Sequence, residues 1–410
     1  MCNWDRDVWL LLASRGGLRS VAGGALGVVT GLYLYYYLHL TLTEVGIFFG
    51  VGAFTAPPLL SLLFGRLGDK YSRKVILLLT LAFLPIATAI LLITRYYPLL
   101  LLAAALGGFG TAGALASGSV GAVAAPVQTA MLADKTEGMD RSMVYAVFNL
   151  VSGTASAIGA LLANLSYRDA FYAALALSAI SLFVVLPIRE EHRPKQRIND
   201  DPSTNSKTMA QQVRRDLTYI KRFAIVGVLN GTAQGLITPF LPIIFKMVLH
   251  VSNGVVGDIF FVGGLAAAFA SLTAPVLSRI FGLRDAIIIP RIISTIALIL
   301  IPFSTTLYLA VTTYVVYVMF RVSSLAPQQA LMMELVGRGG SRSTVSGVNQ
   351  ASRLLPSATA TTVAGPMLDY LPIPVPFAIA FIVNVINIAL YRRFFPPNPK
   401  PMRGGVTVIE

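Results

Sequence analysis

The sequence holds few charges for its length, and this shortage excludes an ordinary water-soluble fold. Only 12% of its 410 residues are charged, whereas 55% are hydrophobic, and the mean hydropathy is +0.72. A soluble domain carries about 25% charged residues, so these charges are too few to cover a surface of normal size. A single soluble core would also exceed the ~250–300 residues at which chains divide into domains. The composition therefore predicts a membrane protein.

Cysteine and histidine are also scarce. The one cysteine, Cys2, excludes a disulfide framework and a cysteine-based metal cluster, and His39, His192 and His250 lie far apart. No G-x-x-x-x-G-K-[ST] phosphate-binding loop occurs, so nothing indicates ATP hydrolysis. A polar start without a small-residue cleavage site argues against a cleavable signal peptide. We expect neither a cofactor nor a metal ion.

Long apolar stretches are abundant. Each can cross ~30 Å of hydrocarbon at ~1.5 Å per residue, and stretches of this length favour helices rather than barrel strands. They predict an all-α membrane protein with about twelve transmembrane helices. The predicted spans are 17–38, 43–64, 75–94, 99–133, 142–164, 170–188, 222–246, 253–277, 286–304, 306–334, 343–368 and 374–391.

The distribution of Lys and Arg predicts the orientation, because cytoplasmic loops are enriched in both. With the N-terminus inside, the inner loops hold most basic residues. The outer loops hold only Arg95 and Arg168, with Lys246 near an outer helix end. The net charge of +14 then reflects topology rather than nucleic-acid binding. We expect a multi-pass protein of the cell membrane with both termini in the cytoplasm, and an interfacial aromatic belt at the tyrosines of 33–37.

One long polar stretch divides the chain into near-equal halves. We expect residues 1–188 to form an N-terminal six-helix bundle and 189–220 a cytoplasmic linker, of which 210–221 forms a short surface helix. Residues 221–394 are then a C-terminal six-helix bundle, and 395–410 a cytoplasmic tail.

An internal repeat indicates that the halves are related. The sequence V-G-I-F-F at 45–49 is echoed by V-G-D-I-F-F at 256–261, an offset of 211 residues (256 − 45) that Arg73 and Arg284 share. Later, Arg141 and Arg342 are offset by 201 (342 − 141). The first half thus carries about ten extra residues (211 − 201), which the glycine-rich run 103–125 accounts for. We expect the fourth helix to be long, kinked or interrupted.

The most specific motif is GRLGDKYSRK at residues 65–74. It resembles the signature loop of the major facilitator superfamily, roughly G-x-L-a-D-r-x-G-R-[RK], and departs from it at Ser72. The two halves and the central linker agree with that family. The resemblance implies two six-helix bundles with pseudo-two-fold symmetry, and a monomer.

By this resemblance, the loop is part of a conformational latch and charge network. Asp69 would pair with Arg73 and lie at the positive N-terminus of the helix that starts near Arg342. The alternative is that these charges only follow the positive-inside bias or snorkel from helix ends. The expected members are Gly65, Gly68, Asp69, Arg73, Lys74, Asp134, Arg141, Glu334 and Arg342.

Two arginines lie near the middle of predicted spans, where a charge is costly and therefore a functional candidate. These are Arg321 and Arg353, and no acid lies at comparable depth. A guanidinium binds carboxylate or phosphate through paired hydrogen bonds, so both predict an anionic or strongly polar substrate. The alternative is that each caps backbone carbonyls or reaches a polar neighbour such as Gln328 or Gln350.

Other polar residues are candidates for a substrate cavity. Asn230 and Gln234 are four residues apart and share a helix face, as do Tyr145 and Asn149. For these, hydrogen bonding between helices is the alternative. Arg19 precedes the apolar body of the first span and either snorkels to the inner interface or faces the cavity.

These features predict secondary active transport of a small solute by alternating access, with an organic anion or a drug-like amphipathic compound as substrate. A proton is the usual coupling ion of the family. Because no midplane Asp, Glu or His is evident, uniport, exchange and coupling through acids such as Asp134 stay open. The expected partners are the substrate and membrane lipids. One alternative is a non-transporting sensor or scaffold. The other is a membrane enzyme that acts on lipid, which would need clustered acids and histidines that the sequence lacks.

Overall fold

The structure is a computed structural model that describes residues 5–55, 72–110, 131–132, 141–188, 206–335 and 341–397. At 73, 141–146, 206–216 and 341–350 it describes the backbone alone. Helices and short connections account for all of these residues, and a described helix overlaps each of the twelve predicted spans, although parts of spans 43–64 and 99–133 lie outside the described residues. The prediction of an all-α membrane fold is confirmed.

The N-terminal half begins with one continuous helix whose second segment is π-helical, η1. Its elements are α1 (Arg6–Leu11), η1 (Leu12–Arg19), α2 (Ser20–Leu32), η2 (Tyr33–Tyr37), α3 (Leu42–Phe54), α5 (Arg73–Ile93), α6 (Tyr97–Gly107), α9 (Arg141–Ala160), η5 (Leu161–Asn164) and α10 (Tyr167–Val185).

The C-terminal half has longer helices, several of them broken. Its elements are α11 (Ser206–Gly235), η6 (Thr238–Phe240), α12 (Leu241–Leu249), α13 (Asn253–Phe281), α14 (Asp285–Leu300), η7 (Ile301–Phe303), α15 (Leu307–Ser323), α16 (Leu325–Leu335), α17 (Ser341–Tyr370) and α18 (Pro374–Phe394). Residues 210–221 lie inside α11, so they do not form a separate short helix.

Hydroxyl side chains start several of these helices. Thr41, Ser72, Ser166, Ser252 and Thr306 each accept a hydrogen bond from a backbone N–H in the first turn of the helix that follows. Such caps satisfy donors that have no partner within the helix. The short connections are thereby placed at the ends of the apolar segments.

Large apolar side chains on the outside of the bundle identify the lipid-facing surface. Among the described residues, nine helical segments are long and apolar enough to span a membrane, and α3 and α6 are shorter apolar helices. Ile93, Phe183 and Ile382 are exposed by more than half of their surface. A surface of this kind is stable in hydrocarbon and not in water.

Helix contacts within the halves follow the repeat. A Cβ atom at Gly24 would collide with the backbone carbonyl of Ser156, and one at Gly235 with that of Ser357. The glycines are offset by 211 residues (235 − 24) and their partners by 201 (357 − 156), as in the sequence motifs. Both glycines let two helices of one half approach closely.

Contacts between the halves obey the same symmetry. A Cβ atom at Gly46 would lie 3.0 Å from the carbonyl oxygen of Thr361, and one at Gly257 would lie 2.5 Å from that of Ala160. The offsets are again 211 (257 − 46) and 201 (361 − 160). The glycine of each repeated motif therefore packs α3 on α17 and α13 on α9.

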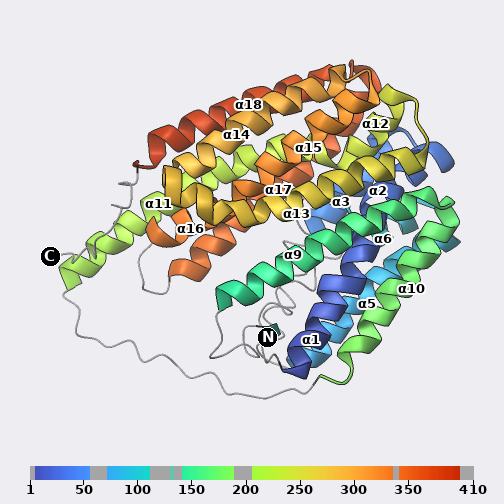
Figure 1. Ribbon diagram of the computed structural model, residues 1–410, viewed down its shortest axis with the longest axis horizontal. Coiled ribbons are helices and arrows are strands. Elements are labelled where there is room, and N and C mark those ends of the chain that lie inside the picture. Colours follow the sequence, from blue (N-terminus) through green and yellow to red (C-terminus); the bar gives the residue numbers. More distant parts are fainter. Residues whose placement is uncertain are drawn as a thin grey trace.

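Among the described residues, the halves share a core at one end and not at the other. One hydrophobic cluster contains residues of both halves, including Phe49 and Phe240, whose ring centroids lie 6.3 Å apart. At the other end each half has its own cluster, around Phe148 in one and Phe223 in the other. We call these the joined end and the split end. Figure 1 shows the two sets of helices meeting at one end and diverging toward the other.

Candidate functional site

Three arginines from different helices of the C-terminal half form a cluster. Arg291 of α14 and Arg321 of α15 are 1% and 4% exposed, and Arg353 of α17 is half-buried. Arg291 and Arg353 both lie close enough to Arg321 to repel it electrostatically. This arginine cluster contains both residues that the sequence singled out, and it adds Arg291.

Arg291 connects four helices through neutral partners. Its Nη1 donates to Oδ1 of Asn387 at 2.7 Å, and its Nη2 donates to Oε1 of Gln328 at 2.6 Å. Its guanidinium carbon lies 4.5 Å from the ring centre of Tyr391, a cation–π contact. Asn387 in turn donates to the carbonyl of Val226 in α11 at 2.7 Å. The positive charge of Arg291 therefore has amides and a ring around it rather than a carboxylate.

Arg353 is the least buried member of the cluster. It donates no hydrogen bond to any described residue, and its buried Nε lacks an acceptor among them. Its backbone carbonyl contacts Gly231, where α17 crosses α11. On α11, Gln234 donates from Nε2 to Oδ1 of Asn230 at 3.2 Å, and both are buried. The prediction that these amides share a helix face is confirmed, whereas their cavity role stays a prediction.

Buried acids are rare where the structure describes side chains. Among them, the one buried carboxylate is that of Asp7, which lies in α1 of the N-terminal half. A charge buried without an opposite charge costs free energy, which a bound counter-ion recovers. Arg291 and Arg353 are therefore candidates for binding an anion.

In the N-terminal half, Arg19 is buried rather than at an interface. It is 5% exposed, and its Nη1 donates to the carbonyl of Leu81 at 3.2 Å. The first helix begins at Arg6 rather than near 17 and places Arg19 about 20 Å along it. The cavity role and the snorkelling alternative both stay predictions. Asn149 is exposed, and the side chain of Tyr145 lies outside the described residues.

The latch network stays a prediction. Gly65, Gly68, Asp69 and Asp134 lie outside the described residues. Arg73, Arg141 and Arg342 are described as backbone only, within the first turns of α5, α9 and α17, and Lys74 follows Arg73 in α5. Glu334 is exposed near the end of α16.

Arg291 is the site residue that the sequence did not indicate. It lies six residues after Asp285, where α14 begins. From the sequence, a basic side chain so near a helix start is interpreted as one that lies at the end of the helix. A signal was present in Asn387, an amide within the apolar span of α18. Amides in such spans commonly bind a polar group of another helix.

A carboxylate joins the halves at the joined end. Asp369, near the end of α17, accepts hydrogen bonds from the backbone N–H of Leu42 at 3.1 Å, the N–H of Thr43 at 2.7 Å and the Thr43 hydroxyl at 2.6 Å. These donors form the first turn of α3, the positive end of that helix. We call this contact the Asp369 clamp.

Other polar contacts between the halves lie at the same end. The Tyr167 hydroxyl donates to Oδ1 of Asn253 at 3.2 Å, and Lys246 Nζ donates to the same oxygen at 2.6 Å. Lys246 also lies 4.1 Å from the ring centre of Tyr36. Tyr33 is 5% exposed, so it packs inward, contrary to the predicted interfacial belt.

Solved transporters share this fold at low sequence identity. A variant of the nucleoside transporter NupG has a TM-score of 0.76 at 15% identity, over 95% of this chain and 100% of that chain. A bacterial homologue of the human lysosomal transporter Spinster has 0.68 at 13%, over 95% and 96%. The human organic anion transporter MFSD10 has 0.60 at 17%, over 94% and 99%. No curated protein matches the chain.

The family model covers nearly the whole chain. Residues 12–221 and 223–408 each match the Major Facilitator Superfamily, so each half is recognised separately. The match agrees with the resemblance of the loop at 65–74 and with the repeated helix contacts. The chain therefore belongs to the Major Facilitator Superfamily and is a multi-pass membrane transporter rather than an enzyme.

Proposed function

We propose that this protein is a secondary active transporter that moves an organic anion across the membrane by alternating access. The observation that carries the proposal is the pair Arg291 and Arg353, two guanidinium groups within the membrane fold, of which one binds neutral groups and the other donates to no described residue. MFSD10, one of the similar structures, is named an organic anion transporter, which supports the same substrate class.

The residues of the cluster have different roles in this proposal. Arg353 binds the anion directly, because it is the member that is only half-buried and its guanidinium can donate two parallel hydrogen bonds to a carboxylate. Arg291 and Arg321 add positive potential from the surrounding helices. Asn230 and Gln234 lie on the facing helix, α11, and select for polar groups on the substrate.

The shared core supports a proposal for the conformation of the protein. By the positive-inside bias, the joined end is the outer side of the membrane, and both termini are cytoplasmic. The protein is then closed to the outside by the Asp369 clamp and the shared core, and the halves separate toward the cytoplasm. The Spinster homologue, whose structure is described as inward-facing and unoccupied, supports this assignment. Transport requires the clamp to open when the split end closes.

Uptake by purified protein in proteoliposomes tests the proposal. A thermal-shift screen would compare carboxylates and phosphate monoesters with their uncharged amides or esters, and the stabilising anion would then be used for uptake. We expect Arg353→Gln to reduce kcat/KM about ten-fold or more, since a hydrogen bond between charged groups contributes about 1.5–3 kcal/mol. Arg392→Gln, which removes an exposed arginine of α18, is the matched control.

The possible results separate the alternatives. Equal stabilisation by the uncharged compounds, or normal uptake by the Arg353→Gln variant, would overturn anion transport. An anion that stabilises the protein without any flux would identify a sensor instead. Uptake with and without a pH gradient, and with the anion inside the vesicles, distinguishes proton coupling from exchange and uniport.

A further inference from the structure

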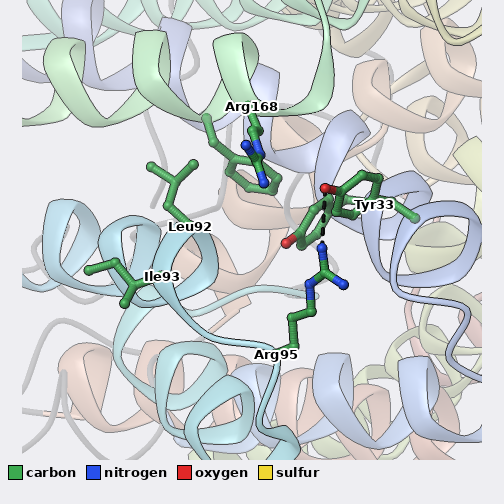
Figure 2. A pocket seen from close by; sticks show the side chains of 7 residues that line it. Tyr33, Leu92, Ile93, Arg95 and Arg168 are labelled. Carbon is green, nitrogen blue, oxygen red and sulfur yellow. Dashed lines mark hydrogen bonds between the residues drawn. The ribbon is translucent and has the colours of Figure 1, made fainter.

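A small pocket lies in the N-terminal half at the joined end, far from the arginine cluster. Its cavity volume is about 110 Å³, well above the ~10–15 Å³ that one water molecule requires. Its walls come from η2, the end of α5 and the start of α10. Figure 2 shows Arg95 and Arg168 extending toward each other from opposite sides, with Tyr33 beside them.

The two arginines of this pocket are the ones that the positive-inside bias leaves unexplained. Arg95 belongs to the loop between α5 and α6, and Arg168 to the first turn of α10. No ion pair joins either arginine to a carboxylate of the described chain. The nearest acid in sequence, Asp169, accepts a hydrogen bond from Ser166 at 2.6 Å. Both positive charges are therefore available to a ligand.

The wall formed by η2 adds a hydroxyl. Tyr37 accepts a hydrogen bond from Nη2 of Arg95 at 3.4 Å, which leaves its own hydroxyl hydrogen to donate into the pocket. Its ring stacks on that of Tyr33, with centroids 5.1 Å apart. Tyr33 is held in turn by a hydrogen bond to the carbonyl of Leu91 at 3.2 Å. The lining of the pocket thus supplies donors from both arginines and from Tyr37.

The repeat gives Arg168 and Asp369 equivalent positions in the two halves, but their contacts differ. Asp369, which clamps the halves, occupies the equivalent position in the C-terminal half, at the offset of 201 residues (369 − 168). In the N-terminal half, the neighbouring Tyr167 makes the contact to Asn253 instead. Arg168 lines the pocket within its own half, which calls for a separate explanation.

The rim of the pocket carries exposed apolar and aromatic side chains. Ile93 lines it and is 86% exposed, and Tyr96 beside it is 66% exposed. Tyrosines in such positions lie at the level of the lipid headgroups. The pocket is therefore open to phosphate groups of the surrounding leaflet and to anions of the adjacent aqueous phase.

We propose that this pocket binds a phosphate group between Arg95 and Arg168. Two guanidinium groups on opposite sides suit a tetrahedral anion, whose oxygens can accept from both at once, while Tyr37 donates to a further oxygen. The phosphate comes from the headgroup of an anionic phospholipid or from a phosphate ion in solution. The chemistry of the site is the same for both sources.

Thermal unfolding of the purified full-length protein in detergent tests the site. One arm adds phosphatidylglycerol, with phosphatidylcholine as the zwitterionic comparison, and the other adds inorganic phosphate, with chloride at equal ionic strength. We expect one arm to raise the melting temperature. In an Arg95→Gln/Arg168→Gln variant, the concentration required should rise about ten-fold or more, because hydrogen bonds to charged groups are each worth about a factor of ten.

A control variant removes the same charge elsewhere. Arg392→Gln/Arg393→Gln lacks two exposed arginines of α18 and should respond like the wild type. Stabilisation by the lipid alone identifies a headgroup site, and stabilisation by inorganic phosphate identifies an aqueous anion site. No stabilisation in either arm, or an equal response of both double variants, would overturn the proposal. Because Arg95 and Arg168 are exposed, their replacement leaves the core unchanged, and each single variant should show an intermediate effect.

Discussion

At the scale of single residues, Arg291 both supports the fold and supplies charge. Arg291→Met should lower the stability of the protein, because the oxygens of Gln328 and Asn387 would lose their donor, at about 1–3 kcal/mol for each buried group left unpaired. Thermal unfolding in one detergent measures the change, and Arg392→Met, on the exposed face of α18, serves as the control.

The opposite result would be equally informative. Replacing a buried charge with an apolar side chain of similar size can stabilise a protein when desolvation outweighs the lost contacts. A higher melting temperature for Arg291→Met would contradict the supporting role. It would show that Arg291 costs stability and is retained for its charge alone.

The sequence predicted two of the three arginines of the cluster, and the position of each arginine along its helix explains why. Arg321 and Arg353 lie far from both ends of their spans, so their depth can be counted along one helix. Arg291 lies near a helix start, and only its contacts with Gln328 and Asn387 show that it is buried. Those partners come from other helices, so an inspection of one span could not reveal them.

At the scale of helices, small residues at crossings determine how closely the helices pack. Gly24→Ala and Gly235→Ala should each destabilise the protein by about 1–3 kcal/mol, the usual cost of an added methyl in a packed site. Gly27 lies on the same helix as Gly24, and a Cβ there would meet nothing within 4 Å. Gly27→Ala should therefore be neutral in thermal unfolding, and an equal loss in all three variants would contradict this account.

Helix ends were predicted less well than helix positions. The glycine-rich run at 103–125 predicted a fourth helix that is long, kinked or interrupted. The structure describes its start, α6, which ends at Gly107, where Gly108 adopts a left-handed backbone with φ of 66°, whereas residues 111–130 lie outside the described residues. The first helix instead starts eleven residues before the predicted residue 17 (17 − 6). Val8 and Leu11 are buried in the core of their half, which stabilises a helical start that looks polar in sequence.

At the scale of the whole molecule, the repeat explains the symmetry of the two halves. It does not explain at which end the halves are closed against each other. The same glycine contact occurs on both sides of the interface, at Gly46 and at Gly257. The free energies of alternative conformations typically differ by a few kcal/mol, which no motif in the sequence reports. The closed side is determined by sums of contacts such as the shared core and the Asp369 clamp.

The Asp369 clamp therefore makes a prediction about the conformational equilibrium. Asp369→Ala removes three hydrogen bonds across the joined end and the charge at the first turn of α3. If the closed joined end loses even about 1–2 kcal/mol of stabilisation, the ratio of the two conformations changes roughly 5–30-fold. The population in which the joined end is open should rise by that factor. Asp369→Asn, which keeps a carbonyl oxygen as acceptor, should have a smaller effect.

Spin labels across the joined end can measure this population. Tyr96 and Tyr308 belong to different halves and are 66% and 88% exposed, so cysteines at these positions would carry labels without disturbing the core. The single native cysteine, Cys2, would be replaced by serine.

Asp285→Ala is the control, because Asp285 pairs with Arg284 within one half, at 2.9 Å. Longer distances in Asp369→Ala but not in Asp285→Ala would confirm the clamp. Identical distributions in both variants would show that the shared core alone holds the joined end closed.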